Sequence, residues 1–467
     1  MSLETIIYYI NVFFFIYMFV YAIIFFLTTF FASLSLDDFF VRKEHMSYTT
    51  LKNDDNYIPI SVIVPAYNEE LTIVDTVRSL LNLDYPKYEI CVVNDGSTDK
   101  TKEILIETFN LKKITRPIRK QVPCKRLNSV YESVDGVRIM LINKENGMKA
   151  DALNMGINAC NYPLFVCMDA DSMLQKDALR RIVVPYIEHD NTVAVGGNIK
   201  LSNDVVIVDG DLKKYRLPKK MIVKFQLVEY LRVFLTSRVA FNKFNANLII
   251  SGAFGLYNKS AVIKVGGYSV DSIGEDMELV VKLHAYFHKN KQDYHISYIP
   301  DAVCWTQAPD KFKILKNQRK RWHRGLIQSL RVNRFMFFNP TYGTVGMISY
   351  PFFVLFEYIT PWLEVLGIIT IIVSYLIGII NTQFFILYLL AYMGYSLVVS
   401  FVSVVLERNM FKNTMTRTMM FQMLGVCVLE SFGYRQCCSL FRISAFFGKD
   451  NKWGTMIRKA NTRTLEE

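Results

Sequence analysis

Acidic side chains follow two apolar runs of this sequence, at Asp169 and Asp171 after one run and at Asp95 after another. Positions i and i+2 of an extended segment project to the same side, so the carboxylates of Asp169 and Asp171 can share one ion. Hard oxygen ligands suit Mg²⁺ or Mn²⁺, which keep several waters and bridge phosphate groups. Asp95 precedes Gly96, which allows close backbone approach, so it is a candidate acceptor for a nucleobase N–H or ribose hydroxyl. The alternatives are two solvated turn acids and a plain Asp-Gly turn.

Two charged positions between and after these motifs extend the same chemistry. Lys149 can reach a diphosphate as a point charge, although a surface lysine is the alternative. Asp276, with Glu275 before it, begins a predicted helix whose N-terminus tolerates negative charge. Asp276 is the candidate general base for a hydroxyl group, with Glu275 beside it in the catalytic pair. The alternative is a pair of first-turn acids that only stabilise the helix.

A basic and aromatic motif follows further along the chain. Gln318, Arg321 and Trp322 stand at positions i, i+3 and i+4 and therefore share one helical face. Arginine can bind a departing diphosphate through two parallel hydrogen bonds, and tryptophan can stack on a sugar ring. An interfacial helix with a tryptophan anchor is the alternative. Upstream, Phe254 and Gly255 are expected in the wall beside the acceptor.

The elements that must position these side chains alternate between short apolar runs and helical stretches. We expect strands at Ile60–Val64, Glu89–Val93, Arg138–Ile142 and Leu164–Met168, and helices that include Glu69–Leu81 and Met148–Ala159. Such runs predict a mainly parallel sheet covered on both faces, in an α/β fold. Ligands bind outside the carboxyl ends of such strands, where Pro65, Tyr67 and Glu69 are further donor-binding candidates. No GxGxxG follows the first strand, which argues against a dinucleotide site.

Two further segments of this central region carry basic residues. Lys112 to Arg126 contains two prolines and is expected as a surface insertion. Ile222 to Ile250 mixes large apolar residues with lysine and arginine. It suits a helix that lies against a membrane or against membrane-spanning helices of the same chain.

Long apolar segments stand near both ends of the chain. Thr5 to Leu36 contains no charged residue and exceeds the roughly 20 residues that span a bilayer, which predicts a membrane anchor. Near the other end, Asn381-Thr382-Gln383 separates two segments of spanning length, Tyr358–Ile380 and Phe384–Leu406, and prolines interrupt the residues before them. Thr418 to Phe447 is apolar but charged at three positions, so a re-entrant, an interfacial and a last spanning element all remain open.

Composition supports a membrane protein: 51% of the residues are hydrophobic, and the net charge is +12. The basic residues lie mainly in the central region and beside the apolar segments, which indicates anionic lipid rather than nucleic acid as the partner. The same pattern places the central region and the tail in the cytoplasm. The eight cysteines contain no CxxC pair, and reduced thiols are expected. The expected division is an anchor at 1–36, a catalytic domain at 55–335, membrane and interfacial helices at 341–447 and a basic tail at 448–467.

With these motifs, the chain resembles the membrane-bound, processive members of glycosyltransferase family 2, and the match to their QxxRW motif at 318–322 is the most diagnostic. The resemblance implies a cytoplasmic GT-A domain and inverting, metal-dependent transfer from a UDP-sugar. It also implies Asp276 as the base, Trp322 beneath the acceptor, and export of a β-linked polysaccharide through a channel in the plasma membrane. It leaves room for accessory export proteins and, as a less favoured class, for a non-processive transferase that acts on a lipid carrier.

The donor sugar rests on the residues after Trp322. Arg324, Gly325 and Gln328 form a W-x-R-G-x-x-Q pattern that is more similar to bacterial cellulose synthases than to poly-N-acetylglucosamine synthases. We therefore expect UDP-glucose and a cellulose-like or mixed-linkage β-glucan. Poly-β-1,6-N-acetylglucosamine made from UDP-N-acetylglucosamine is the alternative.

Overall fold

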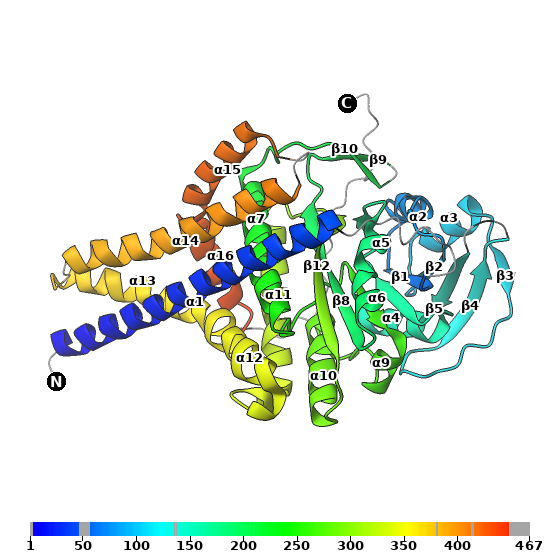
Figure 1. Cartoon of the computed structure of the whole chain (residues 1–467), viewed down its shortest axis with the longest axis horizontal. Helices are drawn as coiled ribbons and strands as arrows, with labels where there is room; N and C mark the ends of the chain where they lie inside the picture. The colour runs from blue at the N-terminus through cyan, green and yellow to red at the C-terminus, as the bar shows by residue number, and fades with distance from the viewer. Residues whose placement is uncertain are drawn as a thin grey trace.

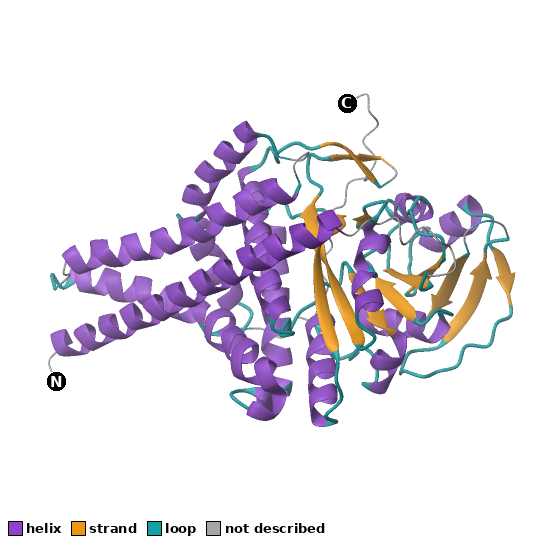
Figure 2. Cartoon of the chain, in the orientation of Figure 1, coloured by secondary structure: helices purple, strands orange, loops and turns teal. Residues whose placement is uncertain are grey.

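The computed structural model describes residues 3–45, 57–134, 136, 138–208, 210–379, 382–411 and 415–447. A mixed sheet and its covering helices form one end of the molecule, and long helices project from the other end (Figure 1). Figure 2 shows the same division, with the strands gathered on one side of a mostly helical part. The tail predicted at 448–467 lies outside the described residues.

Ten strands form the main sheet, in the order β3-β4-β5-β2-β1-β6-β11-β8-β12-β7. All four predicted strands are confirmed, as β1, β2, β5 and β6. The strands are β1 Ile60–Ala66, β2 Tyr88–Asn94, β3 Lys112–Ile114, β4 Leu127–Glu132, β5 Ile139–Lys144, β6 Leu164–Cys167, β7 Met173–Leu174, β8 Thr192–Leu201, β11 Gly255–Asn258 and β12 His295–Thr306, and β9 Val206–Val208 pairs with β10 Asp211–Lys214 in a separate ribbon.

The expectation of a mainly parallel sheet is wrong, because only four of its nine strand pairings are parallel. The other five are antiparallel: β3 with β4, β4 with β5, β6 with β11, β11 with β8, and β12 with β7. The parallel core β5-β2-β1-β6 is the part that helical crossovers build. The strands added outside it arrive through other connections, which the apolar pattern of a single strand does not report.

Alternate residues of the central strands enter two separate cores. Ile60, Val62 and Val64 of β1 pack into one hydrophobic cluster with α2 and α5, whereas Ile63 packs into the other with α4 and α10. Side chains of a strand alternate between faces, so helices must cover both. The helices of this domain are α2 Ile73–Leu81, α3 Thr101–Thr108, α4 Met148–Ala159, α5 Ala178–Ile182, α6 Val184–Glu188, α9 Lys259–Lys264, α10 Glu275–Lys289 and α11 Phe312–Val332.

Two local expectations need correction. The first helix begins at Ile73 rather than at Glu69, because the preceding residues form a turn in which Thr72 donates to the Glu69 carboxylate over 2.8 Å. The segment from Lys112 to Arg126 is not a simple surface insertion. It begins with edge strand β3, and its Val122 is buried in the second hydrophobic cluster.

Two helical segments of the described residues are long and apolar enough to cross a membrane, Thr5–Arg42 and Val345–Leu376. The first lies within α1, Leu3–His45. The second is a succession of helical segments that contains prolines. This succession is η6 Val345–Ser349, α12 Tyr350–Phe352, η7 Phe353–Tyr358 and α13 Thr360–Leu376, after the short turns η4 Arg334–Met336 and η5 Pro340–Tyr342. Helix α14, Thr382–Met410, runs beside α1 (Figure 1).

The charged segment before the tail forms two short helices, α15 Arg417–Glu430 and α16 Tyr434–Ile443. With 14 and 10 residues, each is shorter than a bilayer requires, so the spanning alternative is wrong for this segment.

The expected helix at 222–250 is confirmed for its first part. It forms α7 Met221–Arg232, a π-helical turn η3 Val233–Ser237 and α8 Arg238–Lys243. Helix α7 packs against α14 and α15, and α8 packs against α1.

Candidate active site

Lys149, in the first turn of α4, joins the acidic motifs into one site. Its Nζ lies 2.5 Å from Asp169 Oδ1, 3.5 Å from Glu275 Oε1 and 3.4 Å from the carbonyl oxygen of Gly252. Burial alone would lower the pKa of Lys149, but Asp169 and Glu275 outweigh it and raise the pKa above its usual value. The ammonium group is therefore a fixed positive charge between Asp169, a predicted metal ligand, and the predicted catalytic pair Glu275 and Asp276.

Asp276 is held in place by backbone groups. Its Oδ2 accepts a hydrogen bond from Gly252 N over 3.1 Å, and its Oδ1 accepts one from Met277 N over 2.8 Å. A Cβ atom at Gly252 would stand 3.0 Å from Lys149 Nζ and 3.5 Å from Asp276 Oδ2, so glycine permits this close approach. Glu275 is buried, and burial raises its pKa, with Lys149 acting in the opposite direction. Glu275 thus helps to hold Lys149, while Asp276 presents the less buried carboxylate.

Asp169 and Asp171 lie in the turn between β6 and β7. Burial, and next the charge of Asp169, raises the pKa of Asp171 to about 6. Two carboxylates that resist joint ionisation fit a divalent cation, because its charge would compensate both. Among the described residues no group of three or more His, Cys, Asp or Glu side chains is placed to hold a metal. A two-carboxylate set suits Mg²⁺ or Mn²⁺, which take their other ligands from water and phosphate.

Helix α11 brings the basic and aromatic motif to the same place. Arg321 lowers the pKa of both Asp171 and Glu275, so its guanidinium group lies near both carboxylates. The Trp322 side chain is 43% exposed and therefore available to a ligand. Gln318 is half-buried, and its Oε1 has no hydrogen-bond partner within the part of the chain that the structure describes.

The residue that packs against the Trp322 ring was not predicted from the sequence. The Arg319 guanidinium carbon lies 4.6 Å from the centre of the Trp322 ring, and Arg319 forms an ion pair of 2.8 Å with Glu229 of α7. Arg319 is nearly fully buried, so it holds one face of the indole and leaves the rest exposed. The only sequence signal for this contact is the position of Arg319 three residues before Trp322.

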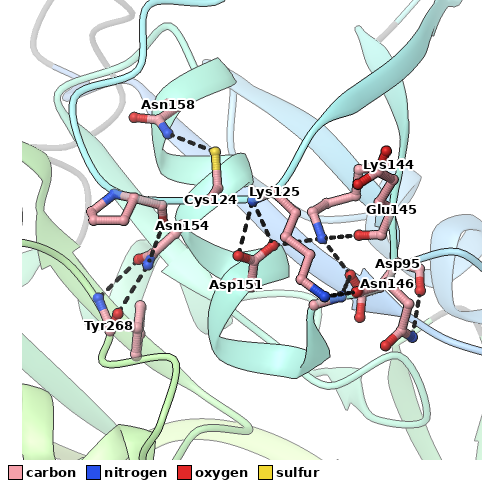
Figure 3. A network of polar contacts seen from close by, with 12 residues as sticks. Asp95, Cys124, Lys125, Lys144, Glu145, Asn146, Asp151, Asn154, Asn158 and Tyr268 are labelled. Carbon is pink, nitrogen blue, oxygen red and sulfur yellow. Dashed lines mark hydrogen bonds and ion pairs between the residues drawn. The ribbon is translucent and has the colours of Figure 1, made fainter.

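Asp95 lies in a buried polar network rather than in an open site (Figure 3). Its Oδ1 accepts from Lys144 Nζ over 2.5 Å and from Gly147 N over 3.0 Å. Lys144 is fully buried and also pairs with Asp151 Oδ1 at 2.6 Å. Asp151 in turn accepts from the backbone N–H of Lys125, which ties the 112–126 segment to helix α4. Asp95 therefore organises the predicted nucleotide loop, and any ligand contact depends on its remaining oxygen.

Lys144 and Asp151 were not predicted as site residues. The available signal was a lysine that ends an apolar strand, next in the sheet to the strand that leads to Asp95. The loops after β1 and β2 are also joined, since Asn68 Oδ1 accepts from Thr98 N over 2.8 Å. This contact brings exposed Tyr67 near the β2 loop.

Four of the predicted binding residues lie in the interior. Pro65 is buried within β1, and the Glu69 carboxylate binds Thr72. Phe254 is fully buried in the first hydrophobic cluster, and Gly255 begins the buried strand β11. Phe254 and Gly255 are thus interior residues, whereas the prediction placed them in the wall beside the acceptor. A strand at the centre of a sheet turns its side chains into the two cores, which the motif alone did not indicate.

The mixed sheet with its acidic turns, the fixed lysine and the basic-aromatic helix form the arrangement that the sequence motifs predict for a glycosyltransferase. The model for "Glycosyl transferase family 2" matches residues 61–266, and that for "Glycosyl transferase family group 2" matches residues 164–401, which is more than half of the chain. The chain belongs to glycosyl transferase family group 2.

Curated relatives and a solved structure agree with this family. A poly-beta-1,6-N-acetyl-D-glucosamine synthase of Staphylococcus epidermidis is 31% identical over 289 residues, which are 62% of this chain and 60% of the relative. The synthase of Staphylococcus aureus strain COL is 31% identical over 273 residues, 58% of this chain and 56% of the relative. The match thus spans less than two thirds of these relatives. A mannosyltransferase from Pyrobaculum calidifontis, solved with GDP-Man and Mn²⁺, has 18% identity and a TM-score of 0.55 over 93% of this chain and 100% of that chain, which is a likeness in fold.

Proposed function

We propose that this chain is a processive, inverting glycosyltransferase that polymerises N-acetylglucosamine from UDP-N-acetylglucosamine and passes the β-linked product through its own membrane helices. The observation that carries the proposal is the meeting of Lys149, Asp169 and Asp276 near Arg321 of α11, the helix that also carries exposed Trp322. The choice of sugar follows the curated relatives, which are named as poly-beta-1,6-N-acetyl-D-glucosamine synthases.

The expected preference for UDP-glucose is based on the residue pattern after Trp322. That preference loses its support because residues of this pattern have a packing role. Gln328 Oε1 accepts from Ile273 N over 3.0 Å, and Gln328 Nε2 donates to Asp271 O over 2.8 Å. Gly325 packs on Gly274: a Cβ atom added at Gly325 would stand 2.7 Å from the Gly274 Cα. These residues brace the loop before Glu275 and Asp276. The pattern after Trp322 therefore has a packing role in α11 and does not by itself select the donor sugar.

Each residue of the site has a role in this reaction. Asp276 removes the proton from the acceptor hydroxyl, whose oxygen then attacks the anomeric carbon on the face opposite the leaving UDP. Lys149 and Arg321 compensate the negative charge that develops on the diphosphate. Asp169 and Asp171 would hold Mg²⁺ or Mn²⁺, which would add further positive charge at the diphosphate. Trp322 stacks on the acceptor sugar and keeps it in line with the donor.

Polar groups that lie between the active site and the membrane helices support the proposal that the same chain exports its polysaccharide product. Arg442 of α16 lies 3.8 Å from Glu229, the residue that also pairs with Arg319. Arg442 also lies 3.7 Å from Glu357, which belongs to the second apolar segment. Further on, a small cleft between α1, α13 and α14 is lined by Tyr17, Glu364 and other aromatic and polar groups. Aromatic faces and hydrogen-bonding groups are the surfaces that a sugar chain contacts. This arrangement suits a multi-pass protein of the plasma membrane with its catalytic domain in the cytoplasm.

The test is synthesis by the purified protein in detergent with Mg²⁺ or Mn²⁺ and one UDP-sugar at a time. UDP-N-acetylglucosamine should yield a long polymer that an N-acetylglucosaminidase degrades and a β-glucanase does not. A glucanase-sensitive product from UDP-glucose would overturn the sugar while leaving the family intact. Transfer of a single sugar to a lipid carrier would overturn processive synthesis.

The role of Asp276 is tested by Asp276→Asn, which should lower the rate by roughly 10²–10⁴ and leave UDP affinity near that of the wild type. A variant with normal turnover but weak donor binding would exclude Asp276 as the base.

A further inference from the structure

Arg238 of α8 is a half-buried cation that the proposed reaction does not yet use. It follows directly after η3, the π-helical turn Val233–Ser237, and such turns widen a helix and change the direction of the residues that follow. Its guanidinium group donates a hydrogen bond to the carbonyl oxygen of Ile249. Among the residues that the structure describes, no carboxylate forms an ion pair with Arg238, in contrast to Arg232, which pairs with Glu430 at 2.7 Å.

The bond from Arg238 fixes the loop that holds Asp276. Three residues after Ile249, the backbone N–H of Gly252 donates to Asp276 Oδ2 over 3.1 Å. The same loop is fastened upstream at Asn247, whose Nδ2 donates to the Arg238 carbonyl over 3.2 Å and whose carbonyl accepts from His284 Nε2 over 2.9 Å. Since His284 belongs to α10, the helix that Asp276 opens, the loop is held between α8 and α10.

The charge of Arg238 also acts on this region. Burial lowers the pKa of Arg238 to about 10, and Tyr298, Asp276 and Glu357 act against that change. The side chain is therefore protonated under ordinary conditions, and Asp276 is one of two carboxylates near it. Lys149 and Glu275 also lie close enough to Asp276 to feel its charge, and Arg321 lies near Glu275.

We propose that Arg238 is a positioning residue for Asp276: its bond to the Ile249 carbonyl sets the loop whose Gly252 N–H orients the carboxylate. The inference rests on the proposed role of Asp276 as base. It connects α8, which packs against the first membrane helix α1, to the geometry of the reacting group.

The experiment is a double-mutant cycle on the full-length enzyme, with UDP release and UDP binding as readouts. Arg238→Met should lower kcat roughly 10–100-fold, since small misplacements of a catalytic group cost about this much, and should leave the UDP Kd within about twofold. Arg238→Lys, which keeps a donor and a charge, should recover most of the rate. In an Asp276→Asn background, Arg238→Met should cause no further loss, because both changes remove one function.

The controls separate this role from general stability. Arg232→Met removes a half-buried, ion-paired arginine from the adjacent helix α7, and it should lower thermal stability while the kcat of the folded enzyme stays near wild type. If Arg238→Met does not fold, Arg238→Gln keeps an amide donor without the charge and replaces it in the cycle.

Three results would overturn the inference: rate losses that multiply in the double variant, a UDP Kd that weakens with the rate, or an equal loss of kcat in Arg232→Met. Normal turnover of Asp276→Asn alone would instead refute the proposed function.

Discussion

Lys144 should be the most sensitive single position of the nucleotide loop, and Lys144→Met tests this directly. The ammonium group is fully buried and lies 2.5 Å from Asp95 Oδ1, 2.6 Å from Asp151 Oδ1 and 2.6 Å from the Glu145 carbonyl oxygen (Figure 3). Methionine fills a similar volume but removes the charge. Two carboxylates, both nearly fully buried, would then lie close together without a cation between them.

The expected cost follows from the broken ion pairs. Removing one partner of a buried pair usually destabilises a protein by about 3–5 kcal/mol, because the remaining charge is left uncompensated. Here two charges are left, although Gly147 N and Lys125 N still donate to them. For a domain of this size about 1 kcal/mol corresponds to roughly 2–4 °C, so the apparent Tm should fall by about 6–20 °C. UDP should also bind more weakly, because the loop that carries Asp95 loses its support.

The assay is thermal unfolding of the detergent-solubilised protein, followed by intrinsic fluorescence, together with UDP binding by calorimetry. Lys125→Met is the matched control, since among the described residues exposed Lys125 Nζ donates only to the Asn146 carbonyl, and its backbone N–H remains. It should cost less than about 1 kcal/mol. The triple variant Lys144→Met, Asp95→Asn, Asp151→Asn should regain much of the lost stability. A Tm of Lys144→Met within 2 °C of wild type, or no recovery in the triple variant, would refute the charge argument.

Three further outcomes are expected. Asp169→Asn or Asp171→Asn should abolish turnover and weaken UDP binding, and a chelator should have the same effect; full activity in EDTA would contradict the metal assignment. Trp322→Ala should impair elongation more than donor hydrolysis, so the ratio of UDP released to sugar polymerised should rise; an unchanged ratio would make Trp322 only an anchor. Burial lowers the pKa of His284 from 6.5 to about 4. Between these values the unfolded chain takes up a proton that the folded chain does not, so stability should fall by up to about 3 kcal/mol as the pH drops from 6.5 to 4. His284→Gln should remove this dependence of stability on pH. If the variant loses as much stability as the wild type between pH 6.5 and 4, groups other than His284 cause the loss.

Local patterns were sufficient for the strands and for much of the site. Four apolar runs predicted β1, β2, β5 and β6, because a buried strand needs nothing but continuous apolar residues of suitable length. The acids that follow such runs lie at the same edge of a parallel core, so Asp169 was expected near other site residues. The helical spacing of Gln318, Arg321 and Trp322 likewise placed these residues on one face of α11.

Tertiary structure alone decided which partner each of these groups has. Phe254 enters the core, and Gln328 braces the loop before Asp276, because strand β11 and helix α11 meet segments far away in the sequence. The direction of β11 against β6 was equally unpredictable from its own residues, since apolar pattern reports burial and not orientation. Lys144 between two carboxylates and Arg238 behind the loop of Asp276 depend on contacts that join different elements of the fold. The sequence by itself therefore determined the kinds of chemical group and the elements that carry them. Their pairing required the folded chain, because electrostatic and hydrogen-bond energies depend on distances that only packing sets.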